Sequence, residues 1–210
     1  MGKVKVKKSD TFIDMTPMSD VMTLLLTFFM LTSTFVKNEP VKVNTPGSVS
    51  ETKVPENGVL TILVSPEKGP TGKPTGEGQV FLSYDNTNEL GQIVDNMGIT
   101  LTPAQKKTFV AESTFGTPLD KLAAYLSKPA AERGKELPKM GIPLDSIQGQ
   151  EMTEFQQWVN AARQVNPKVR LAIKSDSDSP YGTVKKVMSE LQDMDESHYY
   201  MITQLKKQED

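Results

Sequence analysis

Residues 21–36 read VMTLLLTFFMLTSTFV, a run without a single charge. Extending it back to Met15 gives 22 positions that contain one charged residue, Asp20. A hydrocarbon core of about 30 Å requires about 20 helical residues, so the sequence predicts a membrane-spanning helix within 14–36. A cleaved signal peptide is the alternative. It is disfavoured because Lys37-Asn-Glu-Pro40 stands where a small-residue cleavage site would lie, and because Asp20 interrupts the apolar region.

Basic residues are distributed unevenly around this run. Lysines occupy positions 3, 5, 7 and 8 of the tail before it, whereas only Lys37 and Lys42 follow soon after it. The positive-inside rule therefore predicts a cytoplasmic tail over 1–13 and a large part across the membrane. In a bacterium that arrangement is a single-pass inner-membrane protein with a periplasmic domain.

The composition excludes several classes of protein. The chain of 210 residues has 24 basic and 26 acidic side chains, and this balance gives no basic surface for nucleic acid. It has no cysteine and one histidine, which removes thiolate chemistry and any centre that needs two imidazoles. We expect no cofactor, no metal site and no enzymatic activity.

A polar stripe runs along the predicted span. On a helical wheel five side chains fall within an arc of about 60°: Asp20, Thr16, Thr23, Thr27 and Thr34. The threonine hydroxyls can bond a neighbouring helix, carry water, or bond the carbonyls of their own helix. The aspartate has no such local solution, and an unpaired carboxylate costs about 2.5–3.5 kcal/mol at a membrane centre.

Asp20 is therefore the candidate functional residue. Thr16-Pro17 is typical of a helix N-cap followed by proline, which places Asp20 about one turn inside the helix, within reach of water. A carboxyl group at such a position can take up and release protons across a membrane field. Because a lone helix offers no pore, this role requires copies of the chain, a multi-span partner, or both.

The remainder predicts an α+β domain over 58–205, with helices packed on one side of a small mixed sheet. Prolines and glycines interrupt the region after the span, which indicates a linker over 37–57. Within it, 41–44 is either an edge strand in one functional state or a disordered tether. Residues 59–64 and 79–84 are β-rich runs joined by a Pro/Gly-rich connection, the signature of a hairpin with a long loop.

Helix signals follow the hairpin. Thr102-Pro103 and Thr117-Pro118 each resemble an N-cap with proline, opening helices to about Glu112 and Ser127. A third helix is predicted over 151–164 from its apolar spacing. Ser179-Pro180 opens a fourth, between strands at 169–174 and 198–203, with an inner face of Val184, Val187, Met188 and Leu191.

Three other features have simpler interpretations. Asp176 and Asp178 favour an Asx-type turn over a calcium loop, because further ligands are missing. His198, near Ser197, is better explained as a strand-start residue than as part of a hydrolase triad. Trp158 is expected in the core.

Two stretches carry a family resemblance. Residues 14–22 read DMTPMSDVM, and LLLTFFMLTSTF at 24–35 and VKVNTP at 41–46 follow. This pattern resembles the ExbD/TolR family, and 169–176, 181–194 and 199–203 resemble its closing strand-helix-strand. Residues 85–149 have no counterpart and are interpreted as an insertion. Asp14 and Ser19 depart from the motif, which has a polar uncharged and an aliphatic residue there.

The resemblance implies a function. Asp20 aligns with the family's proton-responsive aspartate. The chain would work as a dimer inside an ExbB-like multi-span ring and convert proton flow into force on a TonB-like protein that reaches the outer membrane. Two alternatives stay open: a TolR-like subunit for envelope integrity that holds peptidoglycan, and a membrane-tethered periplasmic adaptor for which Asp20 is dispensable.

Overall fold

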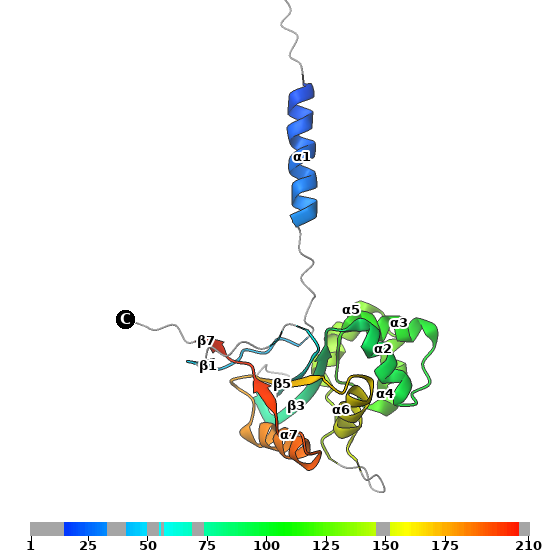
Figure 1. Ribbon diagram of the computed structural model, residues 1–210, viewed down its shortest axis with the longest axis vertical. Helices are drawn as coiled ribbons and strands as arrows, with labels where there is room; N and C mark the ends of the chain where they lie inside the picture. Colours follow the sequence, from blue (N-terminus) through cyan, green and yellow to red (C-terminus); the bar gives the residue numbers. More distant parts are fainter. Residues whose placement is uncertain are drawn as a thin grey trace, which may run out of the picture. The chain divides into compact units, whose positions relative to one another are not determined.

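The computed structural model describes residues 15–32, 41–49, 55, 57–68, 74–145 and 152–205. The chain forms two compact units, residues 1–38 and 39–210. The first contains helix α1 (Thr16–Thr32), drawn in blue in Figure 1, and no residue of this helix is buried. Among the described residues, no helix is both long enough and apolar enough to cross a membrane.

The second unit is built on a five-stranded mixed sheet of order β4-β3-β2-β5-β6. Strands β2 (Val59–Lys68) and β3 (Pro74–Tyr84) form the antiparallel hairpin that the sequence predicts. Strand β5 (Arg170–Ser175) lies parallel to β2, and β6 (Tyr199–Met201) lies parallel to β5. Strand β4 (Thr114–Phe115) pairs antiparallel with the end of β3.

Helices pack against this sheet, so the predicted α+β class is confirmed. The predicted helices are α3 (Pro103–Glu112), α4 (Leu119–Leu126), α6 (Glu154–Val165) and α7 (Tyr181–Asp193). Thr102 caps α3 with a reciprocal capping box, as its sequence indicates. Helix α7 joins β5 to β6 and buries Val187 and Leu191, which confirms the closing strand-helix-strand.

The predicted cap of α4 is wrong. Pro118 itself occupies the N-cap position in an extended conformation, and no side chain caps the helix. Thr117 therefore lies one residue too far from the free amides of the first turn. Its side chain is buried, and its hydroxyl has no hydrogen-bond partner among the residues that the structure describes.

Within 85–149 the sequence prediction missed helices α2 (Thr87–Asn96) and α5 (Ala130–Glu136) and the short 3-10 helix η1 (Leu137–Lys139). Asn86 caps α2 by accepting from the amides of Asn88 and Glu89. Figure 1 shows α2 to α5, in green, gathered together within the second unit.

This block is integral to the hydrophobic core. Leu90, Phe109 and Leu122 belong to the same buried cluster as the side chains of β2, β3 and β5. Trp158 of α6 is 1% exposed and contacts the rings of Phe109 and Phe115, with centroids 5.9 and 4.6 Å away. The prediction of Trp158 as a core residue is confirmed, and residues 85–149 cannot be removed without opening that core.

Residues 41–49 belong to the second unit and pack against its core. Val41, Val43 and Thr45 are buried and alternate with exposed neighbours. The backbone of Asn44 is bonded to the Asp176 carboxylate and to Ser177, so the predicted edge-strand residues are held by a loop instead of a ladder. Strand pairing comes slightly later, where β1 (Gly47–Ser48) lies parallel to β7 (Gln204–Leu205).

Candidate functional site

The first turn of α1 positions the candidate aspartate. The amide of Ser19 donates to the carbonyl of Met15 at 3.0 Å, which makes Met15 the residue before the helix. Thr16 and Pro17 are then the first two helical residues, one position further in than the sequence predicts. Proline is accepted at both positions because the amides of the first turn have no helical partner.

Asp20 lies about one turn inside α1, as predicted, and its side chain is exposed. No other described residue forms a hydrogen bond or an ion pair with its carboxylate. The surrounding positions carry large apolar side chains that are also exposed, such as Met22, Leu24 and Phe28. The carboxylate is thus the one charge of α1, on a helix whose other side chains are apolar or carry hydroxyl groups.

The threonines of the predicted stripe bond to their own helix. Thr23 donates its hydroxyl proton to the carbonyl of Ser19 at 2.8 Å, and Thr27 donates to that of Leu24 at 2.9 Å. This is the local alternative that the sequence left open for the threonines. Thr34 lies outside the described residues. Each hydroxyl oxygen of Thr23 and Thr27 keeps lone pairs that can accept a proton from water or a partner.

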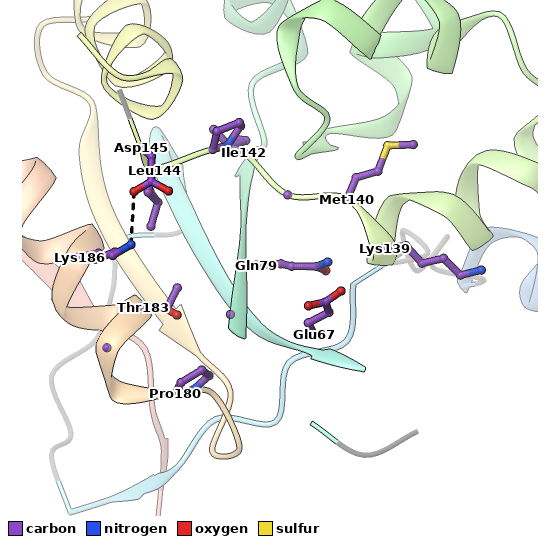
Figure 2. A pocket seen from close by; sticks show the side chains of 14 residues that line it. Glu67, Gln79, Lys139, Met140, Ile142, Leu144, Asp145, Pro180, Thr183 and Lys186 are labelled. Atoms are coloured by element: carbon purple, nitrogen blue, oxygen red, sulfur yellow. Dashed lines mark hydrogen bonds and ion pairs between the residues drawn. The ribbon is translucent and has the colours of Figure 1, made fainter. Parts of the chain in front are cut away.

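A cavity of about 540 Å³ lies in the second unit, beside the end of β2 and the first half of β3 (Figure 2). It is lined by the hairpin, by residues 139–145 after η1, and by the start of α7. Lys186 and Asp145 form an exposed ion pair of 3.3 Å at one side, and Glu67 and Lys139 add one charge of each sign. Its lining is therefore mixed in charge.

Close approach of two elements fixes one wall of this cavity. A Cβ on Gly78 of β3 would lie 2.5 Å from the hydroxyl oxygen of Thr183 on α7, so only glycine fits. Beside it, the side-chain carbonyl of Gln79 is buried without a hydrogen-bond partner. Sequence reasoning missed this cavity, although a glycine inside a strand signals that another backbone or side chain approaches closely.

Two buried acid groups of the second unit have shifted pKa values. Burial raises the pKa of Glu154, while the amide of Leu119, 3.0 Å from its carboxylate, acts in the opposite direction. Burial, together with a hydrogen bond to Glu89, raises the pKa of Tyr84 to about 12. Both groups connect elements of the core, so we assign them to structure.

The other candidate residues take their simpler roles. The Asp176 carboxylate accepts the amide of Asp178 at 3.0 Å, which confirms the Asx-type turn. His198 directly precedes β6, and its Nδ1 lies 3.3 Å from the Ser197 hydroxyl, and no third described side chain bonds to this pair to complete a triad. Over the described ranges, no group of three or more metal-ligating side chains could hold an ion.

The described chain thus combines a mostly apolar helix that carries one unpaired carboxylate with an α+β unit, the arrangement expected of a membrane-anchored accessory protein. The chain matches the family model described as "Biopolymer transport protein ExbD/TolR" over residues 7–205. It belongs to that family, and the resemblance seen in the sequence is confirmed. No curated protein and no solved structure matches the chain.

Membership assigns the chain to the energisation of biopolymer transport in general. The family is a non-enzymatic accessory family whose members work in complexes with ExbB/TolQ and TonB/TolA partners. Its members are generally anchored in the inner membrane.

Proposed function

We propose that this chain is the ExbD-like subunit of an inner-membrane motor that uses the proton-motive force to energise TonB-dependent transport across the outer membrane. One observation supports this most strongly: Asp20 is the sole charge of a helix that is otherwise uncharged and mostly apolar, and no described residue pairs with it. Within a membrane such a carboxylate is stabilised either by pairing with a group of a partner or by binding a proton, which removes its charge.

The proposed mechanism is cyclic protonation of the Asp20 carboxyl group. In its neutral form the group passes along an apolar wall at little cost, and in its charged form it stays where water or a partner group stabilises it. One elementary charge that crosses the field is worth about 2.3 kcal/mol per 100 mV, so repeated cycles can perform work. Thr16, Thr23, Thr27 and Thr34 would support this path as hydroxyl oxygens on the same face.

The proposal places a span over 14–36, with residues 1–13 in the cytoplasm and the second unit in the periplasm. The lysine distribution and the apolar run support this orientation. Protease added to spheroplasts should digest the second unit and spare the N-terminal part. Protection of the second unit would contradict the topology.

The proposed partners follow from what α1 lacks. An ExbB-like multi-span ring would supply the facing wall for its exposed apolar side chains, and a second copy of the chain would place two Asp20 residues in one assembly. The second unit would act on a TonB-like protein. The residues between α1 and the packed segment 41–49 would set the reach between the two parts.

The test is complementation of a strain that lacks its own ExbD-like subunit, with the ring partner expressed beside this chain. The proposal expects TonB-dependent uptake that an uncoupler abolishes. Rescue of envelope leakage without uptake would instead identify the TolR-like subunit. Uptake that persists after uncoupling would identify the tethered adaptor and reject the motor.

A further inference from the structure

A second cavity, of about 530 Å³, lies where β5 and β6 begin. Its lining comes from three places: the end of α6, the turn 166–168, and the residues that lead into β6. The residues that matter chemically are Arg163, Lys168, Arg170, Ser197, His198 and Tyr199. It is separate from the cavity of Figure 2, because the two share no lining residue.

Two cations of this cavity are unpaired. Lys168 and Arg170 are exposed, and neither side chain forms a hydrogen bond or an ion pair with another described residue. Two nearby carboxylates are already bound: Arg163 binds that of Glu196, and Tyr84 and Asn166 donate to that of Glu89. The chain as a whole carries a formal charge of −2, so this local excess of positive charge is a property of the cavity.

The wall that carries these cations is held firmly. Arg163 binds both carboxylate oxygens of Glu196 and donates to the carbonyls of Pro167 and Val169, the latter at 2.7 Å. The Asn166 side chain accepts the amide of Lys168 at 3.0 Å. Both sides of the turn are thus fixed to α6 and to the segment before β6. A preorganised backbone lowers the entropy lost when Lys168 and Arg170 engage a ligand.

Hydroxyl and imidazole groups complete the cavity. The Nδ1 of His198 lies 3.3 Å from the Ser197 hydroxyl, and Tyr199 adds its phenol to the same lining. Two cations on a held backbone, beside hydroxyl and imidazole groups, match a phosphate group. Its negatively charged terminal oxygens accept charge-assisted hydrogen bonds from several sides at once.

We propose that this cavity binds a phosphate group, with Lys168 and Arg170 as its charge partners and the hydrogen-bonded pair of Ser197 and His198 supplying a further donor. The phosphate is either free inorganic phosphate, a soluble phosphate ester, or the headgroup of an anionic lipid. The site is independent of Asp20 and of proton coupling, so its failure would leave the proposed motor function untouched.

The experiment uses the full chain in non-ionic detergent, with isotope-labelled histidine. His198 is the sole histidine of the chain, so its ring gives one set of resonances that reports on the cavity alone. Titration with inorganic phosphate, at an ionic strength held constant with chloride, should shift these resonances saturably. In Lys168→Gln/Arg170→Gln the dissociation constant should rise by about a hundredfold or more, because the variant loses two charge-assisted hydrogen bonds.

The matched control is Lys107→Gln/Lys185→Gln, which removes the same charge from two exposed lysines outside the cavity. It should bind phosphate as the wild type does, and both double variants should unfold at the wild-type temperature. Equal weakening in the two double variants would reject the site as a bulk charge effect. A shift that chloride reproduces, or that never saturates, would also reject it.

A second arm separates the sources of phosphate. The full chain is reconstituted in bilayers of phosphatidylglycerol or of phosphatidylcholine, and the same resonances are compared. A shift in phosphatidylglycerol that the Lys168→Gln/Arg170→Gln variant lacks identifies a lipid headgroup, and a shift with soluble phosphate alone identifies a soluble ligand. Binding of peptidoglycan fragments through these two cations, without any response to phosphate, would overturn the assignment.

Discussion

Helix α1 and the second unit differ in how their apolar side chains are buried and how their charged side chains are paired. In the second unit, apolar side chains from strands and helices share one buried cluster, and charged groups such as Arg133 and Glu112 pair across elements at 2.6 Å. In α1 no side chain is buried, and the threonine hydroxyls bond within the helix. The second unit therefore carries its own stability, whereas α1 exposes an apolar surface and one charge that require contacts beyond this chain.

One pair of phenylalanine substitutions should break this comparison most visibly. Phe155 of α6 is fully buried, and Phe29 of α1 is 66% exposed. Phe155→Ala should lower the free energy of unfolding of the second unit by about 3–5 kcal/mol, because it leaves a cavity in the core. Phe29→Ala should leave that free energy unchanged.

The measurement is chemical denaturation of the full chain, followed by tryptophan fluorescence. Trp158 is the one tryptophan and lies in the core of the second unit, so the signal reports on that unit alone. Equal losses from both substitutions would show that α1 contributes to the stability of the second unit.

A pair of glycine substitutions sharpens the comparison within the second unit. Gly78→Ala should destabilise it by about 1–3 kcal/mol, because the new Cβ would press into Thr183 and force β3 and α7 apart. Gly182→Ala, where a Cβ meets nothing within 4 Å, should be neutral or slightly stabilising. Denaturation followed by Trp158 fluorescence measures both changes in the free energy of unfolding. Tolerance of Gly78→Ala would mean that α7 does not pack against β3 as described.

The smallest effect concerns Glu154 and pH. Its folded pKa lies above the ordinary value of 4.5, so the unfolded chain releases this proton first, and the contribution of Glu154 to stability falls as pH rises from 4.5 through the folded pKa. Glu154→Gln keeps an oxygen that accepts the Leu119 amide and does not titrate. The variant should gain stability relative to wild type across that interval, as denaturation at a series of pH values would measure. A difference independent of pH would refute the assignment.

Much of the second unit was predictable from local signals. Thr102-Pro103 and the apolar spacing of 151–164 gave α3 and α6, because capping and periodicity act within a few residues. The β-rich runs gave the hairpin. The cap at Thr117 failed because a proline can occupy the N-cap position itself, a choice that the Thr-Pro pair alone does not decide.

Long-range contacts were beyond the sequence. Helix α2 is an exception, because its signals are local: a cap at Asn86 and apolar residues at Leu90, Ile93 and Val94. The second cavity joins residues near 163 to residues near 198, and the Gly78–Thr183 contact joins two elements that lie far apart in the sequence. The prediction of Asp20 as the candidate functional residue needs no fold, since a charge in an apolar run is visible in the sequence itself.

The most direct test of the central claim is Asp20→Asn in the complementation assay. Asparagine keeps the shape of the protonated acid and cannot exchange a proton, so we expect uptake to be lost while the assembly with the ring partner stays intact. Asp20→Glu should retain a fraction of the activity, and Asp14→Asn, the matched control outside the apolar run, should retain most of it. Normal proton-motive-force-dependent uptake by Asp20→Asn, at matched expression, would contradict the account.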